Sequence, residues 1–144
     1  MKKSLIILSV LMSLISLNSY AQCGGTTAKT TSASTSTSGG IGIIIYSNDV
    51  ETVYNALRLA VYSITSGDTV KIFLLGKGVE LDTLVKKNSD IRMQVGLFTN
   101  VGGEILGCGT CLKSRNITSP QVCKMSSMSD LYDLIKKSKI VLTF

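Results

Sequence analysis

Short runs of β-branched and other apolar residues alternate with helical patterns from residue 41 to the end of the chain. The run 41–46 (Ile-Gly-Ile-Ile-Ile-Tyr) is apolar at nearly every position, which is typical of a strand buried on both faces of a parallel sheet. Further strands are predicted at 69–75, 104–107 and 140–144. Because strands and helices alternate over short connections, right-handed βαβ crossovers are expected. The sequence therefore predicts an α/β fold with a mostly parallel sheet of four to five strands and helices on both faces.

The longest predicted helix spans residues 49–66, and its apolar side chains recur at helical spacing: Val53, Leu57, Ala60 and Ile64. Asn48 and Glu51 resemble a capping box at its start. Shorter helices are predicted at 79–85, at 91–101 with Asp90 as the cap, at 109–115, and from Ser127 or Ser129 to about Lys137. Residues 117–125 show no regular pattern and are predicted to be irregular.

The N-terminal residues 1–21 have the pattern of a secretory signal peptide. Two lysines precede an apolar run at 5–17, and Ser19-Tyr20-Ala21 fits a cleavage site before Gln22. The run is shorter than the about 20 residues that a membrane span needs, so no stable span is expected after cleavage. An uncleaved anchor and a lipidated Cys23 are the alternatives. We expect a periplasmic or secreted protein.

The mature chain divides into a linker and one domain. Residues 22–40 are rich in Ser, Thr and Gly and are predicted to form a flexible linker, because they cannot bury enough apolar surface to offset their ordering entropy. Residues 41–144 suit a single compact domain. Fifteen basic residues against nine acidic ones give a net charge of +6, but they are scattered and are not interleaved with aromatic residues. No nucleic-acid interface is therefore expected.

The segment 107–115 (Gly-Cys-Gly-Thr-Cys-Leu-Lys-Ser-Arg) carries the most reactive chemistry in a chain without histidine. Cys108 and Cys111 follow directly after a predicted strand, at the end of a parallel strand where ligands bind in such folds. A thiol at the start of a helix is more easily ionised, and the thiolate is the nucleophile. We predict Cys108 and Cys111 as the catalytic pair, with Lys113 and Arg115 as supporting cations.

Other roles for the cysteines remain open. Cys108 and Cys111 could form an inert or redox-active disulfide, which is the default for an exported protein. A zinc site with Cys123 would need a fourth ligand from Cys23 or a carboxylate, so no metal or other cofactor is expected. A thioredoxin-like dithiol has the same spacing, but there the pair opens an early helix, whereas here it follows the third predicted strand.

The segment 107–115 resembles the signature of DsrE/DsrF-like proteins, in which a strand ends in a cysteine and continues into a short helix with a basic residue near its end. The Ile-rich first strand, the Gly-Lys-Gly-Val turn at 76–79 and the Ser-Asp-Leu-Tyr-Asp-Leu helix at 129–134 extend the resemblance. It implies a three-layer α/β/α fold and homo-oligomers, usually trimers or hexamers. It also implies that Cys108 carries a persulfide and that Arg115 is the family's basic residue, although Asn116 replaces the usual glycine.

Three hypotheses follow, of which the third is a dithiol oxidoreductase. The first is an exported sulfur-handling protein, a sulfurtransferase or persulfide carrier, in which Cys108 exchanges sulfur with a donor or acceptor protein in sulfur transfer or sulfur relay. The second is a non-enzymatic oligomeric binding module in which Cys108 and Cys111 form a structural or redox-active disulfide.

Overall fold

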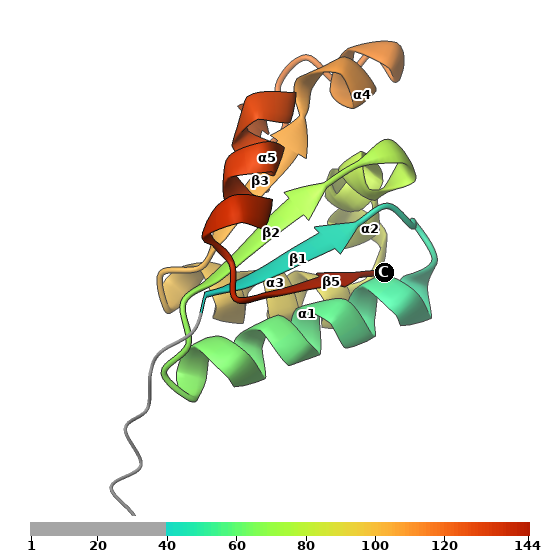
Figure 1. Ribbon diagram of the computed structural model, residues 1–144. Helices are drawn as coiled ribbons and strands as arrows, with labels where there is room; N and C mark the ends of the chain where they lie inside the picture. The colour runs from blue at the N-terminus through green and yellow to red at the C-terminus, as the bar shows by residue number, and fades with distance from the viewer. Residues whose placement is uncertain (1–39) are drawn as a thin grey trace, which may run out of the picture. The chain divides into compact units, whose positions relative to one another are not determined.

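The computed structural model describes residues 40–144, which form a sheet of five parallel strands in the order β4-β3-β2-β1-β5 (Figure 1). The strands are β1 (Ile41–Ile45), β2 (Val70–Leu74), β3 (Glu104–Cys108), β4 (Lys124–Ser126) and β5 (Ile140–Thr143). The helices are α1 (Val50–Thr65), the 3-10 helix η1 (Gly76–Glu80), α2 (Leu81–Lys87), α3 (Ser89–Asn100), α4 (Gly109–Ser114) and α5 (Met128–Lys137). The α/β prediction with a parallel sheet is confirmed.

Helices cover both faces of the sheet. The helices α1 and α3 lie side by side beneath one face, whereas α5 crosses the other face (Figure 1). Gly42 lies under α5, because a Cβ atom at this position would come within 2.3 Å of the Leu134 side chain. Successive strand residues point to opposite faces, so the neighbouring Ile43 points toward α1. The three-layer α/β/α arrangement follows from these contacts.

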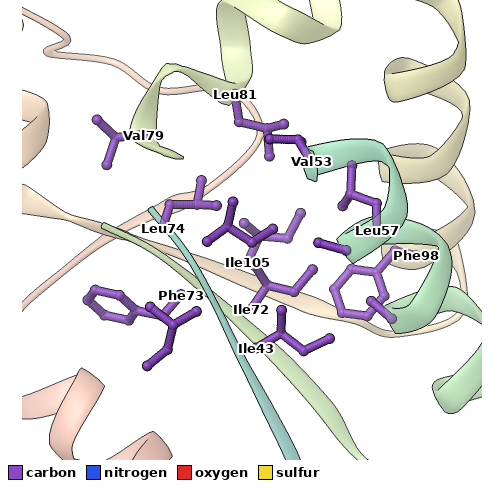
Figure 2. Packing of buried hydrophobic residues seen from close by; sticks show 14 of the residues in the cluster. Ile43, Val53, Leu57, Ile72, Phe73, Leu74, Val79, Leu81, Phe98 and Ile105 are labelled. Atoms are coloured by element: carbon purple, nitrogen blue, oxygen red, sulfur yellow. The ribbon is translucent and has the colours of Figure 1, made fainter. Parts of the chain in front are cut away.

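The core between the sheet and α1 and α3 is mainly apolar, and Ser63 of α1 and Gln94 of α3 are the buried polar residues of these helices. Ile72 and Leu74 of β2 point toward Leu57 of α1 and Phe98 of α3, and each of these side chains is fully buried (Figure 2). Each such side chain contributes about 1.5–3 kcal/mol when it is removed from water. Phe73 points to the opposite face and is equally buried. The carboxyl ends of the central strands, where the thiols lie, are thereby held by a packed core.

The start of α1 differs from the prediction. Asp49, not Asn48, is its N-cap, and the Asp49 carboxylate accepts a hydrogen bond of 2.8 Å from the Thr52 amide. The predicted Asn48–Glu51 capping box is therefore wrong, because the Asn48 side chain points elsewhere and donates to Glu80 over 2.9 Å. A capping box does form at α5, where Ser127 and Asp130 bond to each other's backbone amides.

β4 begins in the segment 117–125, for which the sequence predicts irregular structure. β4 has three residues and pairs only with β3, Leu106 opposite Lys124, so it carries too short a pattern to be recognised. The Asp82 carboxylate holds the segment in place, since it accepts hydrogen bonds from the amides of Gln121 and Val122 over 3.0 Å each. The 79–85 helix is also divided, into η1 and α2, and Asn88 rather than Asp90 caps α3.

None of the helices within residues 40–144 has the length and hydropathy to cross a membrane. The predicted signal peptide at 1–21, Cys23 and all but the last residue of the predicted linker lie outside the described residues.

Candidate dithiol site

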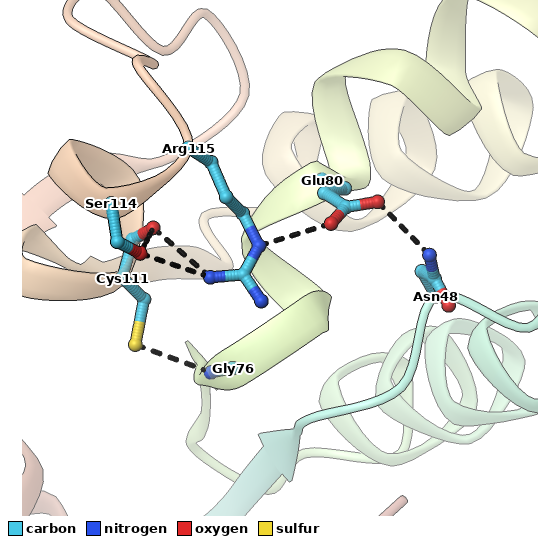
Figure 3. Close-up of polar contacts among 6 residues, drawn as sticks. All are labelled: Asn48, Gly76, Glu80, Cys111, Ser114 and Arg115. Atoms are coloured by element: carbon cyan, nitrogen blue, oxygen red, sulfur yellow. Dashed lines mark hydrogen bonds and ion pairs between the residues drawn. The ribbon is translucent and has the colours of Figure 1, made fainter.

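The carboxyl ends of β2 and β3 bring the two predicted thiols against η1. Cys108 is the last residue of β3 and the N-cap of α4, and its sulfur accepts a hydrogen bond of 3.4 Å from the Cys111 amide. Cys111 lies one turn later, and its sulfur accepts a hydrogen bond of 3.3 Å from the Gly76 amide (Figure 3). Both sulfurs therefore lie at the strand–helix junction, and each receives a backbone N–H.

The two thiols differ in their exposure. The Cys108 side chain is 3% exposed, whereas Cys111 is only partly buried. Both are free thiols in the structure, as is Cys123. Cys111 is therefore the more exposed residue of the pair.

The environment of Cys111 raises the pKa of its thiol. Burial is the main cause, and the hydrogen bond and the charge of the neighbouring Cys108 act in the same direction. The Gly76 amide and the Arg115 guanidinium lower the pKa, but they do not compensate. The expectation that a thiol here ionises more easily is therefore wrong for Cys111, because burial outweighs the nearby positive charge.

Arg115 lies against the backbone of the thiol segment. Its Nη1 donates hydrogen bonds of 3.2 Å to the carbonyl oxygen of Cys111 and to the Ser114 hydroxyl. Its Nε forms an ion pair of 3.0 Å with Glu80, which in turn accepts a hydrogen bond from Asn48 (Figure 3). The Asn48 and Arg115 bonds hold the pKa of Glu80 below its ordinary value, so the carboxylate stays ionised at neutral pH.

The structure thus brings Cys108, Cys111 and Arg115 together but leaves Lys113 apart. The Lys113 side chain is exposed and makes no hydrogen bond or ion pair with another residue of the described domain. Sequence reasoning missed Asn48, Gly76 and Glu80. Asn48 and Gly76 follow β1 and β2, so the rule that sites gather beyond strand ends could have found them.

Cys123 lies against Gly107 of β3, the residue that precedes Cys108. A Cβ atom on Gly107 would come within 2.6 Å of the Cys123 sulfur, so this sulfur occupies the space that a side chain at Gly107 would need. Burial, and secondarily the charge of Asp82, raise the pKa of Cys123 to about 11. Cys123 is therefore protonated at neutral pH and is not a nucleophile there.

A cavity of the described domain lies away from the thiols. It has a volume of about 570 Å³ and lies at the opposite edge of the sheet, where it is lined by the first residues of three strands, Ile41, Val70 and Glu104. Among residues 40–144, no three His, Cys, Asp or Glu side chains are grouped so that they could hold a metal ion. Neither Cys108 nor Cys111 lines that cavity.

Together these features define a three-layer α/β protein with a dithiol at the carboxyl edge of its parallel sheet. The model of the DsrE/DsrF-like family matches residues 40–144, and the chain belongs to this family. An uncharacterized protein of Methanocaldococcus jannaschii is 32% identical over 100 residues, which are 65% of this chain and 88% of that protein. An uncharacterized protein of Methanopyrus kandleri is 30% identical over 100 residues, which are 65% and 83% of the two chains.

Two solved structures share the fold. The ychN protein from E. coli superposes with a TM-score of 0.64 at 22% identity, over 74% of this chain and 99% of that one. A conserved protein of unknown function from Bacteroides thetaiotaomicron gives a TM-score of 0.61 at 19% identity, over 74% and 95% of the two chains. At these identities the likeness concerns the fold alone.

Proposed function

We propose that this protein handles sulfur and that Cys108 carries it as a persulfide in sulfur transfer or sulfur relay. Membership of the DsrE/DsrF-like family supports a role of the sulfur-relay type. The observation that carries the proposal is the position of Cys108, which ends β3 and receives the Cys111 amide at its sulfur. A backbone N–H aimed at a sulfur atom stabilises negative charge there, whether on a thiolate or on a persulfide.

The loading step can be written for a small inorganic donor such as thiosulfate. The Cys108 thiolate attacks the outer sulfur of thiosulfate, and a new S–S bond forms. The S–S bond of the donor breaks, and sulfite leaves with the electron pair. The product is Cys108–S–S⁻, with the negative charge on the outer sulfur. Because Cys108 is only 3% exposed, small donors fit this site better than bulky ones.

Cys111 is the group that releases the carried sulfur. Its sulfur attacks the inner sulfur of the persulfide, a Cys108–Cys111 disulfide forms, the S–S bond of the persulfide breaks, and the outer sulfur leaves with the electron pair and the proton of Cys111 as hydrosulfide, HS⁻. The Cys111 amide lies 3.4 Å from the Cys108 sulfur, so the two residues adjoin at the start of α4. In a relay, the thiol of an acceptor protein would take the outer sulfur in place of this step.

The site of action and the assembly are also part of the proposal. Residues 1–21 support export to the periplasm or beyond the cell. Self-association as a trimer or hexamer is supported by an exposed apolar stripe on α5, made of Met128, Tyr132 and Ile135. The mass of the mature protein tests the cleavage before Gln22, and light scattering after size exclusion tests the assembly.

Mass spectrometry of the sulfur adduct tests the proposed chemistry. The fully reduced protein is incubated with thiosulfate or polysulfide and weighed intact. We expect one added sulfur atom on Cys111→Ser, which loads sulfur but does not release it as sulfide, and none on Cys108→Ser. The wild type and Cys123→Ser are expected to carry the added sulfur until Cys111 displaces it, after which they hold the Cys108–Cys111 disulfide and sulfide is in solution. A Cys111→Ser variant without added sulfur, or equal loading of Cys108→Ser, would overturn the proposal.

A second candidate function is a binding module with a Cys108–Cys111 disulfide. The burial of Cys108 and the raised pKa of Cys111 favour it, because buried thiols that keep their protons react slowly. Thiol titration of the native protein separates the two candidates. A pair that stays oxidised in mild reductant, with a loss of stability when both residues become serine, supports the binding module.

A further inference from the structure

A chain of three polar side chains joins the three loops at the carboxyl edge of the sheet. Asn48 follows β1, Glu80 ends η1 after β2, and Arg115 follows α4 after β3. The Asn48 amide donates to one Glu80 oxygen over 2.9 Å, and Arg115 Nε donates to the other oxygen over 3.0 Å (Figure 3). Each carboxylate oxygen of Glu80 thus accepts a hydrogen bond from a different loop.

Two hydrogen bonds connect these loops to Cys111. Arg115 Nη1 donates to the carbonyl oxygen of Cys111, and the Gly76 amide, at the start of the segment that Glu80 ends, donates to its sulfur. The η1 segment therefore holds the Cys111 backbone through Glu80 and Arg115, and holds the Cys111 side chain directly. Glu80 itself contacts neither thiol in these hydrogen bonds.

We infer that Glu80 is a positioning residue of the dithiol site, which acts through Arg115 to fix Cys111 beside Cys108. Its relevance to sulfur transfer rests on the proposed function. Without the carboxylate, Arg115 loses its ion pair and is free to turn toward solvent, because a partly exposed arginine has many alternative rotamers. The carbonyl of Cys111 then loses a donor, and the turn that carries the thiol loosens.

The charged and titratable groups around Cys111 allow a direct measurement. Cys108 faces it from β3, Arg115 from the end of α4, and Lys77 and Glu80 belong to η1. The guanidinium lowers the pKa of the Cys111 thiol. Since Glu80 holds the guanidinium in place, a variant without the carboxylate is expected to raise this pKa although a negative charge has been removed. A direct electrostatic effect of Glu80 would have the opposite sign.

The experiment follows the rate of alkylation by iodoacetamide against pH, mapped to each cysteine by peptide mass spectrometry. The reduced full chain is used in four forms: wild type, Glu80→Gln, Arg115→Met and the double variant. We expect a higher midpoint pH for Cys111 in Glu80→Gln and in Arg115→Met, and no further rise in the double variant. Asn48→Ala is expected to give a smaller rise in the same direction.

The matched control is Glu104→Gln, which removes a carboxylate that pairs with Lys71 and Lys124 at the other end of β3. It is expected to leave the Cys111 midpoint unchanged. An unchanged or lower midpoint in a folded Glu80→Gln variant, or additive shifts in the double variant, overturns the inference. The measurement uses no sulfur donor, so its outcome is independent of whether Cys108 accepts sulfur.

Discussion

The backbone amide of Gly76 donates a hydrogen bond to the sulfur of Cys111 over 3.3 Å, although the two residues are 35 positions apart in the chain. This bond joins the end of β2 to the helix that follows β3. The sulfur of Cys111 is therefore part of the packing between two loops as well as a candidate reactant. Substitutions at Cys111 therefore change both the packing between the two loops and the reactivity of the site. A comparison of two substitutions at this position separates these effects.

We predict that Cys111→Ala lowers the free energy of unfolding by about 1 kcal/mol more than Cys111→Ser does. Alanine leaves the partly buried Gly76 amide without its acceptor, whereas the serine hydroxyl can accept the same hydrogen bond. Both variants lose the thiol equally, and alanine is the better helix former, so a lower stability of Cys111→Ala reports the loss of the hydrogen bond. Urea unfolding in reducing buffer measures it, and equal stabilities of the two variants would contradict the prediction.

Gly78 is predicted to tolerate no side chain, because η1 passes directly over the end of β1. A Cβ atom there would lie 2.0 Å from the carbonyl oxygen of Ile45 and 2.8 Å from its carbon, and backbone atoms in a central strand cannot yield. We expect Gly78→Ala to lower the free energy of unfolding by about 3 kcal/mol or more, at the upper end of overpacking.

Gly96→Ala is the matched control for Gly78→Ala. Gly96 lies within α3, and no atom lies within 4 Å of an added Cβ there. We expect this substitution to stabilise the protein by about 1 kcal/mol, because alanine is the better helix former. Similar effects of the two substitutions in urea unfolding would argue against the close approach of η1 to β1.

The sequence predicted the elements that have a strong local pattern. The apolar run at 41–46 and the helical spacing after it locate β1 and α1, and the junction at Cys108 follows from the end of an apolar run beside glycines. β4 was missed, because three exposed or partly exposed residues at the edge of a sheet have no periodicity.

The candidate site was only partly predictable, because its contacts depend on the order of the strands. The Asn48–Glu80–Arg115 chain exists because β1, β2 and β3 are neighbours in the sheet, and hydrophobic periodicity does not reveal which strands are neighbours. The pKa of Cys111 likewise depends on burial and on the amide of Gly76, which is 35 positions away in the chain. Local spacing identified the thiols but not their environment.

A side chain at Gly107 is predicted to clash with the sulfur of Cys123. The added Cβ of Gly107→Ala would lie 2.6 Å from the Cys123 sulfur and 3.3 Å from a methyl carbon of Leu112, so we expect a loss of about 1–3 kcal/mol in the free energy of unfolding. Cys123→Ala removes the sulfur and leaves an ordinary contact of 3.6 Å between the two Cβ positions.

The double variant Gly107→Ala/Cys123→Ala is therefore expected to be more stable than Gly107→Ala alone. Urea unfolding of the four proteins in the cycle gives the coupling between the two positions. Additive effects of the two substitutions would show that the added methyl group does not meet the sulfur.

The thiol of Cys123 is predicted to make the free energy of unfolding depend on pH in the alkaline range. Its pKa is about 11 in the folded protein, above the ordinary value of 9.0, because burial and the Asp82 charge favour the neutral form. The folded state therefore holds this proton more tightly than the unfolded state does. The resulting stabilisation is fully retained below pH 9 and is lost as the pH rises from about 9 toward 11.

The comparison of wild type with Cys123→Ala isolates this contribution from the lysines and tyrosines that titrate in the same range. We expect the difference in free energy of unfolding between the two proteins to be constant from pH 7 to about pH 8.5 and then to shift in favour of Cys123→Ala. Asp82→Asn is expected to weaken this shift, because the neutral side chain no longer opposes the Cys123 thiolate. A difference that stays constant up to pH 10.5 would show that the Cys123 sulfur is as accessible to water in the folded protein as in the unfolded chain.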